Sequence, residues 1–381
     1  MSHEGLNRRA FLSALGYGVT RACLLGKRAT WAQAAAVATP ATSKPTRRVD
    51  HFEAFPDGSV ACGVCPHACV LHDGEVGRCR ARINRGGVHY ALGYGNPCIV
   101  QVDPIEKLPI NHFRPGARML TISCGGCNLG CLYCQNWQQA QERPDQLKTF
   151  ELSPREAVAA ARKHKLDIIG FTYTEPIAFL EYARDIAVQA KETGIKIVVG
   201  TSAFVHPEPL LELARYADAF AITLKGFDDG FYQEVCGARL DPVLTAIKTL
   251  HERTRCWLEI INLVVPTYND RMEDVSALAR WVHAELGKDV PLHFARFVPL
   301  YKLTDLPRTA VPTLESACAV AREAGLRHVY TSNIAPHRDT NTYCDGCKTV
   351  VVERLGFKIL SNNLRHGRCP ICRRPIPGVW A

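Results

Sequence analysis

The chain has 381 residues and a net charge of +9, with 47% hydrophobic and 22% charged residues. These values are ordinary for a globular protein and allow one large domain with appendages. No basic run of the kind that forms a dedicated nucleic-acid-binding arm is present, and no run of about 20 apolar residues could span a membrane. Seventeen cysteines are unusual at this length. They occur in spaced sets, which in a reducing compartment indicates metal sites rather than disulfides.

Residues 1–45 are predicted to be a leader. Arg8 and Arg9 stand before Phe11 and an apolar stretch, an arrangement that resembles a twin-arginine export signal. Residues 32–34, Ala-Gln-Ala, could be a cleavage site. Two interpretations stay open: export of a prefolded cofactor protein, or an uncleaved amphipathic leader on a cytoplasmic enzyme.

Residues 46–117 are predicted to form a small cysteine-rich unit. One His, His67, and four cysteines fall within 18 positions: Cys62, Cys65, Cys69 and Cys79. Such a set suits a compact metal site that holds zinc or a second cluster, and the alternative is a group of small buried side chains. Residues 103–109 contain two prolines, which predict a loop rather than a helix.

Residues 118–335 alternate between apolar runs and amphipathic stretches. The predicted strands are residues 119–123, 168–173, 196–200, 219–224, 257–264, 292–297 and 329–331. Helices are predicted over 153–163, where Ser153 opens a capping pattern, and over 179–191 and 208–216. This alternation is typical of βαβ units with a parallel sheet. The expected fold is α/β, an incomplete (β/α)6 barrel of the TIM type whose open side could admit a large substrate.

Residues 336–381 contain two C-x2-C pairs separated by 21 residues, formed by Cys344, Cys347, Cys369 and Cys372. This spacing is typical of a zinc ribbon, with strands predicted over 349–353 and 357–360. Four thiolates leave zinc no open position, so the predicted site is structural. A rubredoxin-type iron site is the alternative.

A loop at residues 123–137 follows the first predicted barrel strand and contains the spacing C-x3-C-x2-C: Cys127, Cys131 and Cys134. Active sites of such barrels lie at the C-terminal ends of the strands. Three thiolates can hold three irons of a [4Fe–4S] cluster and leave the fourth open to a substrate. Cys124 leaves a fully ligated cluster or a zinc knuckle as alternatives, although three residues between the pairs is very tight for zinc.

The spacing resembles that of radical SAM enzymes, which bind S-adenosylmethionine at the open iron and cleave it to a 5′-deoxyadenosyl radical. That resemblance implies further cofactor-binding residues at the strand ends. Glu175 would accept a hydrogen bond from the cofactor's amino group, and Lys225 would pair with its carboxylate. Tyr133 would shield the cluster. Further inward-pointing candidates are Asn262 and His293, although only one residue in two on a barrel strand faces inward.

Motifs along residues 60–380 together resemble one family, the radical SAM component of the AmmeMemoRadiSam system, a relative of the pyruvate formate-lyase activating enzymes. They lie at residues 62–69, 103–107, 126–137, 173–176, 224–227, 301–307 and 376–380. The chain departs from that pattern at Thr223, where an Asp is common, and at Cys124, where a Thr or a small residue is usual. The resemblance implies the cofactors [4Fe–4S] and S-adenosylmethionine, and links the chain to Memo-like and AMME-candidate-like partners.

Three functions are therefore compared. The first is a radical SAM enzyme that modifies a protein or RNA, reduced by a flavodoxin or ferredoxin. The second is activation of a glycyl radical enzyme, although activases with extra clusters carry their additional cysteines after the radical SAM loop rather than before it. The third is a non-enzymatic iron–sulfur or zinc scaffold, which conflicts with the combination of the three-cysteine loop with Glu175 and Lys225. Because both S-adenosylmethionine and a low-potential donor are cytoplasmic supplies, we expect a cytoplasmic location and no membrane association.

Overall fold

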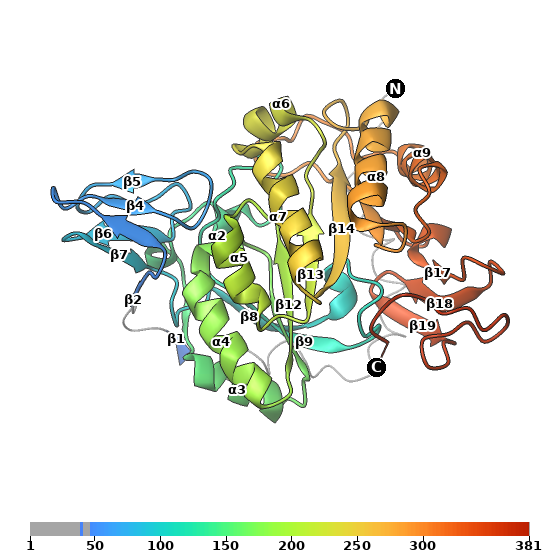
Figure 1. Ribbon diagram of the computed structural model, residues 1–381, viewed down its shortest axis with the longest axis horizontal. Coiled ribbons are helices and arrows are strands. Elements are labelled where there is room, and N and C mark those ends of the chain that lie inside the picture. The colour runs from blue at the N-terminus through green and yellow to red at the C-terminus, as the bar shows by residue number, and fades with distance from the viewer. Residues whose placement is uncertain (1–38, 41–45, 381) are drawn as a thin grey trace, which may run out of the picture.

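The computed structural model describes residues 39–40 and 46–380. The leader predicted over residues 1–45 lies outside the described residues, apart from residues 39–40. The rest of the chain forms three parts in sequence order (Figure 1): a small β-rich unit, a central layered α/β part, and a second small β-rich unit. The two small units lie at opposite ends of the central part.

The central part is built on one mixed sheet of eight strands in the order β16-β15-β14-β13-β12-β11-β9-β8. The strands are β8 (Ile99–Pro104), β9 (Arg118–Ser123), β11 (Ile168–Phe171), β12 (Lys196–Thr201), β13 (Ala219–Thr223), β14 (Trp257–Val264), β15 (Leu292–Arg296) and β16 (Val329–Ser332). Neighbours from β9 to β16 pair in parallel, and β8 pairs antiparallel with β9. Within the described residues β8 and β16 are the two edges, so the sheet does not close.

All seven strands predicted from the sequence form the parallel portion, whereas β8 was not predicted. The two prolines in residues 103–109 predicted a loop, and a loop does follow Pro104. The residues before it, Ile99–Pro104, form β8 by pairing with β9. One 3₁₀ turn, η1 (Ile105–Lys107), interrupts the predicted loop. The parallel strands alternate with helices as predicted, and the count of six βα units in an incomplete barrel stays a prediction.

Helices cover the outer face of this sheet (Figure 1). The longer ones are α3 (Pro154–Lys163), α4 (Leu180–Glu192), α5 (Pro207–Ala214), α7 (Leu240–Arg253), α8 (Met272–Leu286) and α9 (Val311–Glu323), and α2 (Trp137–Ala140) and α6 (Asp229–Phe231) are single turns. Ser153 caps α3 as predicted: its side chain accepts from the Glu156 amide while the Glu156 carboxylate accepts from the Ser153 amide. Each long helix buries one apolar stripe against the strands.

The segment between β8 and β9 packs against the inner face of the sheet. Ile105, Leu108, Ile110 and Phe113 are buried there against small and apolar strand residues such as Ala221. The interior is consequently a packed core near the N-terminal ends of the strands, and free space remains only toward their C-terminal ends.

A buried carboxylate anchors this filled end. Glu259 on β14 accepts hydrogen bonds from the backbone amides of Asn111 and His112, from Trp257 Nε1 and from His293 Nε2, at 2.7–2.9 Å. Neither Glu259 nor His293 has an exposed side chain. Burial by itself would favour the neutral acid, but the hydrogen bond from His293 and its charge lower the pKa of Glu259 below its ordinary value of 4.5.

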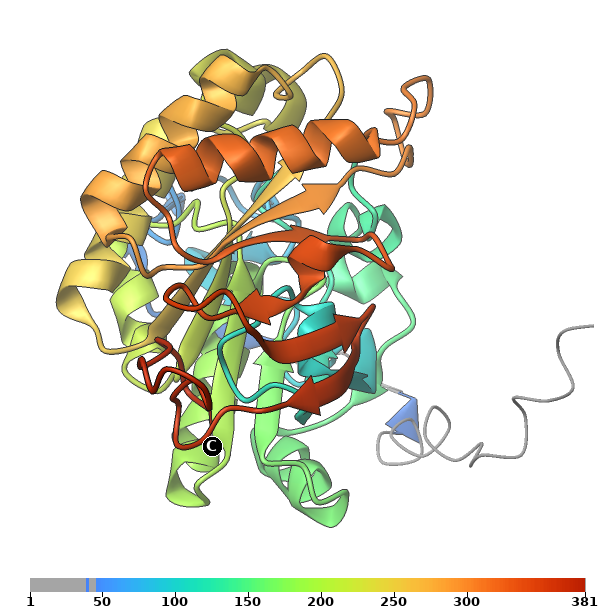
Figure 2. The same cartoon turned by 90° about the vertical axis from the view of Figure 1, so that its right-hand side faces the viewer.

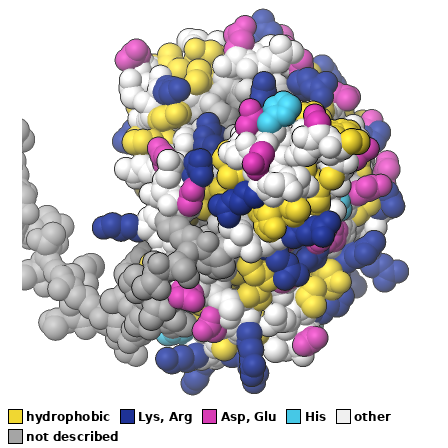
Figure 3. Space-filling view, turned by 90° about the vertical axis from the view of Figure 1, so that its left-hand side faces the viewer, with side chains coloured by type: hydrophobic (Ala, Val, Ile, Leu, Met, Phe, Trp, Pro, Cys, Tyr) yellow, Lys and Arg dark blue, Asp and Glu magenta, His cyan; other side chains and the backbone are white. Residues whose placement is uncertain are grey.

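The N-terminal unit consists of two three-stranded sheets, β3-β4-β5 and β2-β7-β6. Their strands are β2 (Arg47–Arg48), β3 (Phe52–Ala54), β4 (Val60–Cys62), β5 (Val70–Leu71), β6 (Arg82–Arg85) and β7 (Val88–Ala91). A buried ion pair ties the unit to the barrel, because both Nη atoms of Arg82 donate to the Glu181 carboxylate on α4. Basic, acidic and hydrophobic side chains are interspersed on the face at this end (Figure 3).

The C-terminal unit is the antiparallel sheet β17-β18-β19, with β17 (Thr342–Tyr343), β18 (Val350–Leu355) and β19 (Lys358–Asn362). The last two are the predicted ribbon strands. Arg354 donates to the Asn111 carbonyl at 2.8 Å, and a Cβ on Gly116 would lie 3.4 Å from Ile359. The ribbon therefore packs on the segment that fills the barrel, as the red strands in front of the cyan segment show in Figure 2.

We expect Glu259→Ala to lower the free energy of unfolding by about 3–5 kcal/mol at pH 7, because it leaves buried donors without an acceptor. A carboxylate whose folded pKa is lowered adds stability above its unfolded pKa and loses that stability as the pH falls through the folded value. The difference between wild type and variant should thus be constant above about pH 4.5 and shrink below it.

Denaturant unfolding followed from pH 7 to pH 3 measures this difference. Glu285→Ala is the matched control, because Glu285 pairs with Lys248 at 2.6 Å on the surface, where solvent screens the pair. A pH-independent difference between wild type and Glu259→Ala would show that the charge of Glu259 contributes nothing.

Candidate active site and metal centres

A cavity of about 360 Å³ opens at the C-terminal ends of the parallel strands. That volume is within the range of small-molecule sites. Its lining includes Cys127, Cys131, Cys134, Glu175 and Lys225. The loop that follows the first parallel strand and the ends of β11 and β13 are far apart in sequence, yet the parallel register brings them to one place, as expected for a barrel.

Backbone contacts hold the three-cysteine loop. The amides of Gly130 and Leu132 donate to the carbonyls of Cys236 and Val235, which lie on the π-turn η4 (Tyr232–Cys236). Gly126 has φ +91°, and a Cβ there would lie 2.5 Å from the Cys79 carbonyl oxygen, so only glycine fits. The loop is thereby wedged between the N-terminal unit and η4.

The three thiols differ in their surroundings. Burial raises the pKa of Cys134 to about 11 and raises that of Cys127 well above its ordinary value. A hydrogen bond with Cys236 lowers the pKa of Cys131 to about 7. Cys236 also lies 3.6 Å from the Tyr133 hydroxyl, and nothing in the sequence pattern drew attention to it.

Cys124 points elsewhere. Its side chain has no exposed surface, its Sγ donates to the Gly93 carbonyl at 3.0 Å, and it is not among the residues that line the cavity. This placement agrees with the interpretation of Cys124 as a small residue at the end of a strand.

Glu175 is 3% exposed and lies at the cavity beside the cluster loop. One carboxylate oxygen accepts from Thr201 Oγ1 at 2.7 Å and from the Ile177 amide at 3.3 Å. The other accepts from the amide and hydroxyl of Ser202 at 2.9 and 2.6 Å. Four donors therefore fix the direction of this carboxylate.

Lys225 follows β13 and presents its ammonium to the thiols. The backbone amide donates to the Tyr232 hydroxyl, and the backbone carbonyl accepts from Asn262 and Asn269. Burial opposes the charged form, but the nearby thiolates, that of Cys131 foremost, raise the pKa of Lys225 above its ordinary value of 10.5. Tyr133 lines the same cavity and is 4% exposed.

Two sequence predictions need correction. Asn262 does not face inward: its neighbours Ile261 and Leu263 do, and its own amide donates to the carbonyls of Leu224 and Lys225. Its observed contact is with the loop backbone that carries Lys225. His293 does face the barrel interior, but it lies one layer below Ala295, hydrogen-bonded to Glu259 in the filled end, and it is not among the residues that line the cavity.

Sequence reasoning missed a polar network that also lines the cavity. The Asp103 carboxylate accepts from Gln101, from the Tyr173 hydroxyl at 2.8 Å and from Lys107 at 3.0 Å. Tyr173 has φ +71°, a conformation that a bulky residue rarely adopts. The residues of this network belong to the family-like motifs at 103–107 and 173–176. Because β8 was not predicted, the sequence did not show that these two motifs lie side by side.

The donor set fits a [4Fe–4S] cluster with S-adenosylmethionine. Cys127, Cys131 and Cys134 are soft ligands grouped on one loop, and Cys124 donates away from it. The cavity also offers an anionic and a cationic side chain, Glu175 and Lys225, for a ligand with an ammonium and a carboxylate.

A second constellation lies in the C-terminal unit. The Sγ atoms of Cys344, Cys347, Cys369 and Cys372 all lie within 4.8 Å of one another and could hold one metal ion. Two of the sulfur pairs, Cys344–Cys372 and Cys347–Cys369, are 3.4 and 3.5 Å apart. In the N-terminal unit, Cys62, Cys65, Cys69 and Cys79 line a second, smaller cavity.

The model of the radical SAM superfamily matches residues 121–281, the part that contains the three-cysteine loop and β9 to α8. The chain belongs to the radical SAM superfamily. A [4Fe–4S] cluster and S-adenosylmethionine are the cofactors that membership implies, and it supports an enzyme.

The chain is 42% identical to the uncharacterized protein MJ0808 of Methanocaldococcus jannaschii. The 332 aligned residues cover 87% of this chain and 98% of that protein. The chain is 27% identical over 109 residues to the benzylsuccinate synthase activating enzyme of Thauera aromatica, across 28% of this chain and 33% of that enzyme. A domain of a pyruvate-formate lyase-activating enzyme from Bacteroides vulgatus matches 43% of this chain and 98% of its own, with 17% identity and a TM-score of 0.38.

Among the described residues, no helix is both long and apolar enough to cross a bilayer.

For the C-terminal set we expect about one zinc per chain, bound tetrahedrally, because four thiolates at this spacing suit a single ion. Removing the ion should loosen residues 342–380 before the barrel, since metal binding there contributes folding free energy. Metal analysis and hydrogen exchange of the full chain, before and after chelation, measure both effects. Cys318→Ala is the control. Unchanged protection of residues 342–380 after complete removal of the metal would contradict a structural role.

Proposed function

We propose that this protein is an enzyme that cleaves S-adenosylmethionine reductively and uses the product to modify a protein or RNA. The observation that carries the proposal is the convergence of Cys127, Cys131, Cys134, Glu175 and Lys225 on one cavity. A [4Fe–4S] cluster in that place supplies the electron that cleaves a C–S bond of S-adenosylmethionine to give a 5′-deoxyadenosyl radical.

The protein's own residues bind and orient the cofactors. Cys127, Cys131 and Cys134 hold the cluster. Glu175, fixed by Thr201 and Ser202, would bind the ammonium of S-adenosylmethionine, and Lys225 would bind its carboxylate. The low exposure of Cys131, Tyr133 and Glu175 would limit the access of water to the reacting group.

The open side of the barrel supports a large substrate. The cavity is lined by Asp103 and Lys107 at one sheet edge, and by Asn333, just after β16, at the other. Phe357, at the tip of the ribbon hairpin, also lines it while remaining 49% exposed. An exposed aromatic at the mouth of an open cavity suits contact with a macromolecule better than enclosure of a small molecule.

The local likeness to the benzylsuccinate synthase activating enzyme favours a second candidate, activation of another enzyme by hydrogen abstraction. Finer features are also part of the proposal: membership of the AmmeMemoRadiSam group, Memo-like and AMME-candidate-like partners, reduction by a flavodoxin or ferredoxin, and action in the cytoplasm. Co-purification of a Memo-like protein, as against a glycyl radical enzyme, separates the two candidates.

Anaerobically reconstituted protein should cleave S-adenosylmethionine to methionine and 5′-deoxyadenosine when reduced. Each of Cys127→Ala, Cys131→Ala and Cys134→Ala should abolish that cleavage, because each removes a ligand of the cluster. Cys124→Ala is the matched control and should retain it, since its Sγ bonds to Gly93 instead. Product analysis by liquid chromatography decides; loss of activity in Cys124→Ala alone would overturn the ligand assignment.

Glu175→Ala should weaken S-adenosylmethionine binding by roughly 10- to 100-fold, the value of one charge-assisted hydrogen bond. Lys225→Ala should act similarly on the carboxylate side. Ser202→Ala should have a smaller effect, because it removes a hydrogen bond to Glu175 but leaves the charge. Titration of the cofactor into reconstituted variants measures the affinities.

Glu208→Ala, an exposed residue in the first turn of α5, is the control and should bind normally. The cluster should assemble in all four variants, since its ligands lie elsewhere on the chain. Wild-type affinity in both Glu175→Ala and Lys225→Ala would remove these residues from cofactor binding.

A further inference from the structure

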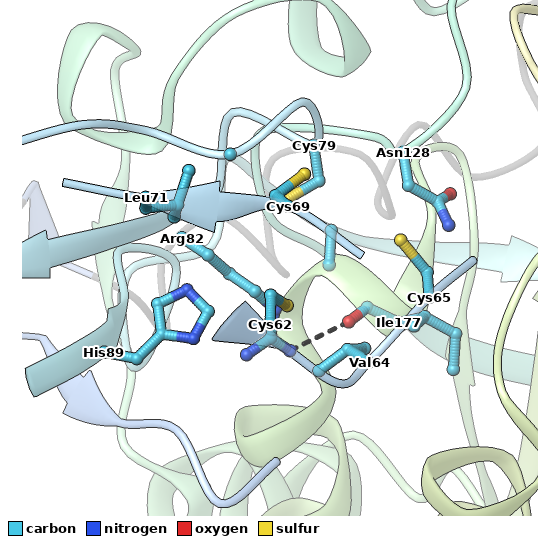
Figure 4. A pocket seen from close by; sticks show the side chains of 12 residues that line it. Cys62, Val64, Cys65, Cys69, Leu71, Cys79, Arg82, His89, Asn128 and Ile177 are labelled. Atoms are coloured by element: carbon cyan, nitrogen blue, oxygen red, sulfur yellow. Dashed lines mark hydrogen bonds between the residues drawn. The ribbon is translucent and has the colours of Figure 1, made fainter. Parts of the chain in front are cut away.

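Four cysteines of the N-terminal unit face a common space. Cys62, Cys65, Cys69 and Cys79 line one cavity from β4, from the loop after it and from the turn before β6 (Figure 4). The cavity has a volume of about 20 Å³. The cysteines are free thiols, so no disulfide uses them.

The four sulfurs stand too far apart for one zinc ion. Zn–S bonds of about 2.3 Å in a tetrahedron put every pair of sulfurs about 3.8 Å apart. In the C-terminal set all four ligand atoms lie within 4.8 Å of one another. Among the described residues no other three metal-binding side chains meet that limit, the N-terminal cysteines included. In an iron–sulfur cluster the thiolates bind two or more irons, so their sulfurs are spread more widely.

A second observation points to a ligand with acceptor atoms of its own. His89 lines the same cavity and has no exposed surface, yet neither of its ring nitrogens has a hydrogen-bond partner in the described structure. Burial lowers its pKa to about 3, so the ring is neutral and carries one N–H to donate. The sulfides of a cluster would accept that hydrogen bond.

This cavity is joined to the three-cysteine loop by direct contacts. Asn128, the residue after Cys127, lines it. Its backbone carbonyl accepts from His67 Nε2 at 2.7 Å, and its side-chain amide donates to the Phe204 carbonyl at 2.6 Å. On the other side of the loop, Arg80 lies 3.4 Å from the Cys127 carbonyl oxygen. Asn128 therefore lies beside the cavity of the N-terminal cysteines and next to Cys127 in the sequence.

We propose that Cys62, Cys65, Cys69 and Cys79 ligate an iron–sulfur cluster that passes electrons to the site of Cys127, Cys131 and Cys134 through Asn128. One electron leaves a low-potential one-electron donor protein, which is oxidised by one electron, and arrives first at the N-terminal site and then at the three-cysteine site; no atom or proton is transferred. The relay, though not the ligation, rests on the proposed function.

The ligation is tested by metal content. Anaerobically purified full-length Cys127→Ala/Cys131→Ala/Cys134→Ala should retain about two to four irons with equal sulfide, and about one zinc per chain. Its Mössbauer spectrum should show a polynuclear cluster. Further replacement of Cys62 and Cys65 by Ala should remove that iron, whereas further replacement of Cys318, a buried cysteine on α9, should not. Absence of iron together with about two zincs in the triple variant would overturn the proposal, and neither result depends on S-adenosylmethionine cleavage.

The relay is tested with the loop intact. In Cys62→Ala/Cys65→Ala, dithionite should still drive a single turnover of S-adenosylmethionine cleavage, but turnover with reduced flavodoxin should fall at least tenfold. Asn128→Ala, which keeps every thiol, should slow flavodoxin-driven reduction of the cluster, followed by its visible absorbance. If both variants are reduced by flavodoxin at the wild-type rate, electrons do not pass through this site. If dithionite also fails in wild type, it is the proposed function that fails, while the metal count still decides the ligation.

Discussion

The structure depends on one constraint: three thiols on an irregular loop must be held in a fixed arrangement inside a protein. Irregular backbone cannot satisfy its own hydrogen bonds, so neighbours must do so. Here η4 accepts from the amides of Gly130 and Leu132, Arg80 approaches the Cys127 carbonyl, and Gly126 leaves room for the backbone of Cys79. The N-terminal unit is therefore not an independent appendage, because it forms one wall of the loop.

The charged residues around the loop are also held by hydrogen bonds to their neighbours. Thr201 and Ser202 fix the direction of the buried Glu175 carboxylate, and hydrogen bonds to Tyr232 and Asn262 hold the backbone of Lys225. In such surroundings charge-assisted hydrogen bonds are stronger than at a surface. The network of Asp103, Lys107 and Tyr173 adds further polar groups to the lining of the same cavity.

The sequence predicted most of this arrangement where a local pattern carried the information. Apolar periodicity located the seven parallel strands, and cysteine spacing singled out the loop and the ribbon. It failed where position depends on distant partners. β8 follows from pairing with β9, not from its own composition, and its absence hid the role of Asp103. Asn262 and His293 were chosen by strand position alone, but a shift of one residue changes the face, and a shift of two changes the layer.

The C-terminal ribbon contacts both the filled end of the barrel interior and the cavity at its other end. Glu259 fixes the backbone of Asn111 and His112, Arg354 of β18 donates to the Asn111 carbonyl, and the Tyr330 hydroxyl donates to Thr342 at the start of the ribbon. The hairpin is thus held at its base by the filled end of the barrel while its tip, Phe357, reaches the cavity. A metal held by the four C-terminal cysteines would stabilise the fold that fixes this hairpin, whose tip lines the cavity.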